Sequence, residues 1–151
     1  KNIFMSDKGF EIIDHTADVG IKVWAEKLTD LFTEAASAVI SIMFDRDTIK
    51  GNETSSVTVE AESIEELFLQ WLKELLYVME RDEMVFSEFH IENNIFSSYD
   101  DFKYFIQAEL KGEKLNPKRH GICTEIKAVT RHNFFVKKEV NLWKTFVLFD
   151  I

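Results

Sequence analysis

The chain of 151 residues has one cysteine, Cys123, and one proline, Pro117. A lone cysteine excludes an internal disulfide and a paired-cysteine metal or redox motif. We predict that Cys123, in a strand-like run, is a small core residue rather than a nucleophile. With only five glycines and no low-complexity segment, the chain lacks the composition of a disordered protein or of a linker between two domains.

No apolar stretch reaches the roughly 20 residues that a membrane-spanning helix needs. The longest candidate, residues 39–44, is short and lies within a helical pattern. No signal peptide is evident either. The sequence therefore predicts a cytoplasmic protein.

Basic residues are also fewer than acidic ones. The chain has 18 lysines and arginines and 27 aspartates and glutamates, which gives a formal net charge of −9. Proteins that grip RNA carry a basic surface that neutralises phosphates. We therefore expect direct RNA binding to be weak or absent, although Lys114, Lys118, Arg119 and His120 could form a local basic patch. An acidic surface fits metal ions or a basic protein partner better.

Aromatic residues are plentiful, with 14 phenylalanines, three tryptophans and three tyrosines to fill a core. The length is that of one domain. We predict a flexible N-terminal segment at residues 1–8 and a single domain at residues 9–151.

Hydrophobic periodicity predicts two amphipathic helices among about eight strands. One helix spans residues 29–44, and another starts at a Ser63–Glu66 capping box and ends near residues 81–83. Residues 93–101 read as a turn and 111–121 as a polar loop. The predicted strands are 9–14, 21–26, 54–61, 85–92, 102–110, 122–130, 134–139 and 142–150. This order favours an α+β fold, a largely antiparallel sheet or sheets with both helices packed on it.

Polar groups concentrate in residues 14–20, between the first two predicted strands. Taken alone, Asp14, Thr16 and Asp18 read as a turn in which side chains bond to nearby amides and Gly20 provides the bend.

The other end of the chain favours a second interpretation of this segment. Residues 146–149 are apolar on both strand faces, which predicts a central, buried strand. That strand ends in Asp150 and Ile151, and Ile151 carries a free carboxylate if it is the last residue. Adjacent carboxylates at a buried strand end need a cation or donors. Together with Asp18 they predict an all-oxygen site for a divalent metal ion, Ca²⁺ first, with Mg²⁺ or Mn²⁺ as alternatives.

Several other chemistries lack their residues. The sequence has no glycine-rich phosphate loop, no GxSxG elbow and no His-x-His motif. A dyad of Cys123 with one of the four histidines is disfavoured by the strand context of the cysteine. His132 follows a predicted strand and reads either as a surface hydrogen-bonding residue or as a functional one.

Four blocks in order resemble the archease family, over roughly residues 9–151. They are Asp14–Gly20 (DHTADVG), 31–36 (LFTEAA), 125–132 (EIKAVTRH) and 147–151 (VLFDI). One departure is Arg131, where relatives often have an aromatic residue.

The resemblance implies an accessory protein rather than an enzyme. Archeases assist the RtcB-type RNA ligase that joins tRNA halves in tRNA splicing, and are thought to promote its guanylylation and multiple turnover. The resemblance also implies a metal site at Asp18, Asp150 and Ile151. The candidate supporting residues, in the motifs around that site, are Asp14, His15, Lys127 and His132.

Two further functions remain open at this point. The protein could be a chaperone or modulator of a tRNA-modifying enzyme such as a methyltransferase, a role also linked to the family. It could instead be a small metal-dependent hydrolase that uses Asp18 and Asp150, with His15 or Asp14 as the acid or base. The sequence leaves the oligomeric state open.

Overall fold

The computed structural model describes residues 7–14, 16–92, 96–97 and 103–151. The elements are β1 (Lys8–Asp14), β2 (Asp18–Ala25), α1 (Leu28–Met43), a 3-10 turn η1 (Arg46–Thr48), β3 (Glu53–Ala61), α2 (Ile64–Asp82), β4 (Met84–Ile91), β5 (Phe96–Ser97), β6 (Tyr104–Lys114), α3 (Pro117–His120), β7 (Ala128–Glu139) and β8 (Leu142–Asp150). None of the helices among these residues has the length and apolarity needed to span a membrane. The predicted flexible segment 1–8 falls almost wholly outside the described residues.

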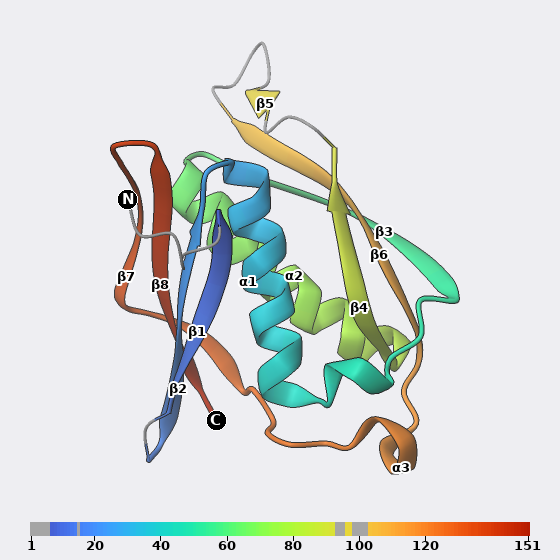
Figure 1. The fold of residues 1–151 in the computed structure, drawn as a ribbon. Coiled ribbons are helices and arrows are strands. Elements are labelled where there is room, and N and C mark those ends of the chain that lie inside the picture. The colour runs from blue at the N-terminus through green and yellow to red at the C-terminus, as the bar shows by residue number, and fades with distance from the viewer. Residues whose placement is uncertain (1–6, 15, 93–95, 98–102) are drawn as a thin grey trace.

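The strands form two antiparallel sheets, as Figure 1 shows. The first has the order β1-β2-β8-β7, so the last strand of the chain lies beside the second. The other has the order β3-β6-β4, and β5 pairs with β6. The α+β class and the antiparallel pairing predicted from sequence are therefore confirmed.

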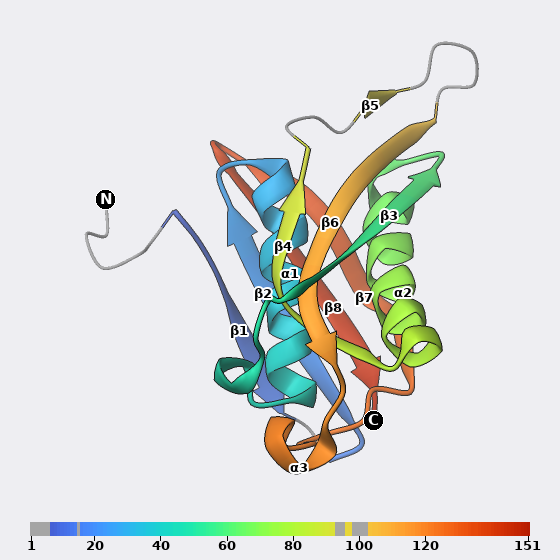
Figure 2. The same ribbon diagram turned by 90° about the vertical axis from the view of Figure 1, so that its right-hand side faces the viewer.

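Both helices lie between the two sheets (Figures 1 and 2). α1 contacts β1 and β2 of the first sheet and β4 of the second, while α2 contacts β3, β4 and β7. Two-sided burial explains the composition of α1, whose Ala35, Ala36 and Ala38 are fully buried and let strands approach on both sides. A helix that is apolar nearly all round is typical of this position.

The second helix starts as predicted at Ser63, whose hydroxyl accepts a hydrogen bond from the backbone N–H of Glu66 at 3.1 Å. The reciprocal half of the capping box is absent, because the Glu66 carboxylate instead pairs with Arg131 of β7. The helix ends at Glu83, whose backbone is left-handed (φ 53°). Left-handed residues commonly terminate helices.

A buried hydrogen bond joins the two helices in the middle of the core. The indole Nε1 of Trp71 donates to the backbone carbonyl of Phe32 at 2.8 Å. Beside it, the rings of Phe32 and Phe68 meet edge to face at 4.9 Å. The bond satisfies the polar atom of a side chain that is otherwise wholly surrounded by apolar groups.

The segment that follows β6 differs from the sequence prediction. β6 continues to Lys114 and pairs with both β3 and β4, and the short helix α3 follows it, so residues 111–121 are not one loop. Only Ile122 of the predicted strand start makes a bridge, to Phe44, and regular pairing begins at Ala128. Cys123 is exposed, so the prediction of a core thiol is wrong.

The predicted strands 122–130 and 134–139 merge into the single strand β7. Its register against β8 breaks between Thr130 and Phe135, so that residues 131–134 lie opposite Val147 alone. Such irregularities redirect side chains within a strand. Most of the predicted turn at 93–101 lies outside the described residues; within it, Phe96–Ser97 form β5.

Candidate functional site

The candidate metal ligands meet at one end of the first sheet, where β2 begins and β8 ends (Figure 1). Asp18 is the register partner of Asp150. Their neighbours Val19 and Phe149 are buried in the core, so alternation places both aspartates on the opposite face, away from the helices. Opposed residues of an antiparallel pair have Cα atoms about 4.5–5.5 Å apart, close enough for two carboxylates to share one ion.

Neither aspartate forms an ion pair with any of the described residues. Two like charges opposite each other destabilise a sheet unless a cation offsets them. The donors are all oxygen, which suits a hard divalent cation. In the described part of the chain, no three His, Cys, Asp or Glu side chains cluster tightly enough to hold a metal. An ion at this pair would therefore need further ligands besides Asp18 and Asp150.

The backbone around Asp150 is held on both sides. Asp18 lies opposite it on β2 and Ala128 on β7, and its carbonyl accepts from the N–H of Lys127 at 2.8 Å. Ile151 is half-buried and packs against the core. The contact that the structure shows for Lys127 at this site is made by its backbone N–H, and its side chain is exposed.

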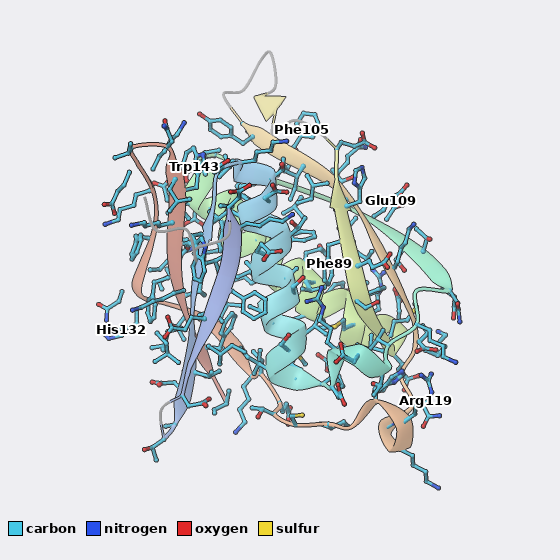
Figure 3. All side chains as sticks on the ribbon, in the orientation of Figure 1. Phe89, Phe105, Glu109, Arg119, His132 and Trp143 are labelled. Carbon is cyan, nitrogen blue, oxygen red and sulfur yellow. The ribbon has the colours of Figure 1, made fainter. Side chains whose placement is uncertain are left out.

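A shallow groove of about 420 Å³ runs from Asp18 along the outer face of the sheet. His132 borders it, because the irregular stretch of β7 projects this residue outward. Asn133, with a left-handed backbone (φ 57°), makes the bend. Figure 3 shows His132 pointing away from the helical layer. The groove is lined by Thr16, Ala17, Asp18, His132, Asn133, Phe146 and Leu148.

The remaining candidates are not brought into this groove. Asp14 ends β1 opposite Val19 and is exposed, but it does not line the groove. His15 lies outside the described residues. Asp18 and His132 thus line the same groove on the outer face of the sheet. Asp14 lies beside this groove, at the end of β1.

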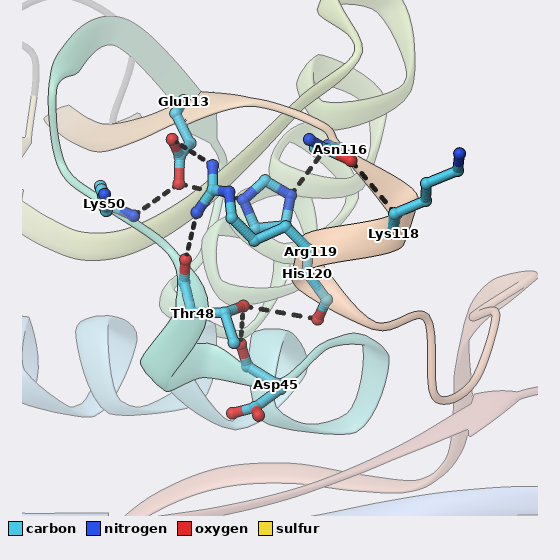
Figure 4. Close-up of polar contacts among 8 residues, drawn as sticks. All are labelled: Asp45, Thr48, Lys50, Glu113, Asn116, Lys118, Arg119 and His120. Carbon is cyan, nitrogen blue, oxygen red and sulfur yellow. Dashed lines mark hydrogen bonds and ion pairs between the residues drawn. The ribbon is translucent and has the colours of Figure 1, made fainter.

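In the basic patch considered from sequence, Lys114, Lys118 and Arg119 are exposed and His120 is buried, and two of the four residues take part in an internal polar network (Figure 4). His120 is fully buried, and its Nδ1 accepts from the backbone N–H of Asn116 at 2.9 Å. The ring proton is therefore on Nε2, which donates to Glu113 at 3.0 Å. Arg119 also pairs with Glu113, at 2.7 Å, and donates to the carbonyl of Thr48.

These contacts stabilise the Glu113 carboxylate as an anion. The hydrogen bond from Arg119, then those from His120 and the Lys50 backbone, lower its pKa from 4.5 to about 2. The network ties the end of β6 and α3 to the segment after α1. We interpret it as structural, since every charged member is already satisfied within it.

Sequence reasoning missed the groove residues Asn133, Phe146 and Leu148. The apolar run 146–149 predicted a central strand buried on both faces. β8 is central, but only Val147 and Phe149 are wholly buried, while Phe146 and Leu148 face outward and are partly exposed. The irregularity that positions Asn133 has no signal in the sequence.

The comparisons with known proteins cover almost the whole chain. A family model described as the archease protein family (MTH1598/TM1083) matches residues 10–151. The chain is 35% identical to protein archease of Methanosarcina mazei over 144 residues, 95% of this chain and 97% of that protein. It is also 35% identical to protein archease of Methanosarcina barkeri over 149 residues, 97% of this chain and 100% of the relative.

Two solved structures share the fold. The solution structure of Methanobacterium thermoautotrophicum protein 1598 superposes with a TM-score of 0.80 at 29% identity, covering 95% of this chain and 99% of that one. A crystal structure from Thermotoga maritima, described as an archease and possible chaperone, gives a TM-score of 0.61 at 20% identity, with coverage of 92% and 94%. At that identity the second likeness concerns the fold alone.

Proposed function

Because the chain belongs to the archease protein family, we propose that it is a non-catalytic accessory protein that activates an RtcB-type RNA ligase in tRNA splicing. Its action is to promote guanylylation of the ligase and so to permit multiple turnover. The sequence agrees with a supporting role, since it has no recognisable glycine-rich loop for binding the phosphates of a nucleotide.

The observation that carries this proposal is the opposed pair Asp18 and Asp150 at the exposed end of the sheet. In this proposal the pair holds a divalent cation, Ca²⁺ first and Mg²⁺ or Mn²⁺ as alternatives, with the carboxylate of Ile151 as a third ligand where the chain ends there. A bound cation would supply positive charge and vacant coordination positions to a partner's phosphates or carboxylates.

The surrounding residues keep this pair in place. The Lys127 N–H holds the Asp150 carbonyl at 2.8 Å, which fixes the end of β8. His132 stands on the rim of the same groove, where its ring nitrogens can form hydrogen bonds. In this proposal both residues position groups around the ion, and neither of them takes part in a chemical step.

The charge of the molecule supports a ligase partner. A net charge of −9 makes the protein a poor holder of RNA and complements the basic surface expected of an enzyme that grips RNA. Complementary charge speeds the encounter of the two proteins, which suits an activator that serves many ligase molecules.

A small metal-dependent hydrolase is the second candidate, and one observation favours it. His132 and Asp18 line one groove, so a general base and a metal ligand face the same space. Hydrolysis of a phosphoester by the isolated protein would support this alternative over the accessory role.

The deciding experiment is a multiple-turnover ligation assay with the RNA ligase of the same organism. This protein is titrated from zero to one equivalent, and we expect turnover to rise at well below one equivalent. Asp18→Ala should abolish the effect. Asp47→Ala, an exposed aspartate in the turn after α1, is the matched control and should activate like wild type.

Two results would contradict the proposal. One is the same number of ligase turnovers at every concentration of the wild-type protein. The other is an Asp18→Ala variant that keeps its fold by circular dichroism and activates as well as wild type.

A further inference from the structure

A second, larger hollow lies on the outer face of the first sheet. Its volume is about 630 Å³, and its walls come from β2, β7 and β8. It adjoins the groove of Asp18 and shares Asn133 and Phe146 with it, but none of the candidate metal ligands lines it. No described helix or strand covers this face, because α1 and α2 both lie on the other side (Figure 2).

Aromatic rings lie across the sheet at this hollow. A Cβ atom built on Gly9 would stand 2.8 Å from the six-membered ring of Trp24, and one built on Gly20 would stand 2.9 Å from the ring of Phe146. Each ring therefore rests over a glycine instead of standing upright from its strand. Aromatic residues often cover strand glycines for stability. The rings thus form an apolar floor. The charged side chains around this floor determine which kind of ligand it can bind.

Lysines gather around this floor in an otherwise acidic protein. Lys22 is the register partner of Phe146, Lys144 that of Trp24, and Lys144 also lies directly opposite Lys137. Like charges opposite each other destabilise a sheet. Lys137 is paired with Glu139 at 3.0 Å, whereas Lys22 and Lys144 form no ion pair with the described residues.

The two features together select a ligand that combines a flat apolar ring with an anionic group. Three rings, from Trp24, Phe135 and Phe146, offer apolar and π surface, and two amines that form no ion pair with the described residues offer charge. The volume is that of a small-molecule pocket. We propose that this hollow binds a nucleoside monophosphate, with its base on the aromatic floor and its phosphate bound by the flexible amines of Lys22 and Lys144 that flank the rings.

The surrounding carboxylates favour a single nucleotide over an RNA strand. Glu11 lies opposite Lys22, and Asp18 and Asp150 lie four residues farther along their strands, about 13 Å away at 3.3 Å per residue. An RNA strand that extended from the hollow toward these residues would bring its phosphates close to acidic side chains. A monophosphate stays within reach of the lysines.

The first test is isothermal titration calorimetry of the whole protein with GMP and AMP in the presence of EDTA. EDTA removes any ion at Asp18 and Asp150, so binding would depend neither on that site nor on a ligase. Guanosine and inorganic phosphate serve as the two halves of the ligand. We expect each half to bind at least about tenfold more weakly than GMP, because a charge-assisted contact is worth about 1.5–3 kcal/mol.

The second test changes the charges without changing the fold. Lys22→Gln with Lys144→Gln should weaken GMP binding at least about tenfold, since two charge-assisted contacts are lost. Lys73→Gln with Lys111→Gln removes the same charge from exposed positions on α2 and β6 and should leave binding unchanged. Phe146→Leu tests the aromatic floor, and circular dichroism confirms that each variant is folded.

Several results would overturn the proposal. They are no binding of GMP or AMP at millimolar concentration, equal binding of inorganic phosphate, and full binding by the folded double variant of Lys22 and Lys144. An eight-nucleotide RNA that binds more than tenfold tighter than GMP would identify an RNA strand as the occupant and would also overturn it.

Discussion

The buried carboxylate of Glu113 offers a quantitative test of the structure. Glu113→Gln keeps the shape of the side chain and an oxygen that can accept from His120 and from the Lys50 N–H, but it removes the charge that faces Arg119. A pKa lowered from 4.5 to about 2 corresponds to about 3 kcal/mol at 1.36 kcal/mol per unit. Because the Arg119 side chain is 39% exposed, solvent screens this pair, and we expect a loss nearer to 2 kcal/mol at pH 7.

The pH dependence of that loss has a definite sign. The pKa of Glu113 is lower in the folded state, so its stabilising effect is fully present above the unfolded value of 4.5 and is lost as the pH falls toward 2. The free energy of unfolding of wild type and Glu113→Gln, measured in urea by circular dichroism, should therefore differ most at pH 7. The difference should shrink steadily between pH 5 and pH 2.

A matched control lies on the same strand. Glu109 of β6 is exposed, and it lies apart from Arg119 (Figure 3), so Glu109→Gln should change the free energy of unfolding by less than about 0.5 kcal/mol. Equal effects of the two substitutions would refute the assigned role of the Glu113 network. A Glu113→Gln loss that stays constant from pH 7 to pH 3 would refute it as well.

Three further predictions concern the metal site, the core and the second sheet. Asp150→Ala should weaken Ca²⁺ and Mn²⁺ binding by calorimetry while the protein keeps its fold, because one of two opposed carboxylates is lost. Leu75→Ala, at a fully buried position, should lower the free energy of unfolding by about 2–5 kcal/mol, whereas Tyr77→Ala, 56% exposed on the same helix, should cost much less. Gly112→Ala should destabilise by about 1–3 kcal/mol or more, because its Cβ would stand 1.8 Å from the Val85 carbonyl oxygen.

Controls for these predictions come from the same chain. Asp47→Ala should leave the affinity for Ca²⁺ unchanged, and equal affinities in wild type and Asp150→Ala would remove Asp150 from the site. Gly51→Ala meets its nearest atom, the Cβ of Lys111, at 3.4 Å, so it should be close to neutral in urea unfolding. A loss below about 0.5 kcal/mol for Leu75→Ala would mean that this face of α2 is not packed in the core.

The elements of this fold were predictable where burial follows a simple period. Residues 29–44 and the helix after Ser63 repeat apolar side chains every three to four positions, and the observed helices agree within one or two residues. Strands such as 54–61 alternate cleanly and were also found. The placement of both helices between two sheets was not predicted. The sequence pattern shows which residues are buried, but it does not show which helix or sheet packs against them.

The errors fall where tertiary contacts override local sequence. The Glu66 carboxylate has a partner 65 residues away in Arg131, which no capping pattern anticipates. Residues 122–127 carry strand-like residues but belong to neither sheet, and Cys123 is exposed there. The pairing of Asp18 with Asp150 was inferred from carboxylate chemistry and resemblance, and its antiparallel register could be known only from the structure.

The strand order of the first sheet also affects how the protein can fold during its synthesis. β2 finds its central partner in β8, so residues at opposite ends of the chain must meet before this sheet exists. On a ribosome, α1, α2 and the β3-β6-β4 sheet emerge earlier, while the β1–β2 hairpin waits with one edge unpaired. Long-range pairings of this kind form slowly and leave strand edges open to aggregation in the meantime. Asp18 and Asp150 therefore come together only after the end of β8 has been synthesised, so a chain truncated before Asp150 lacks the opposed pair.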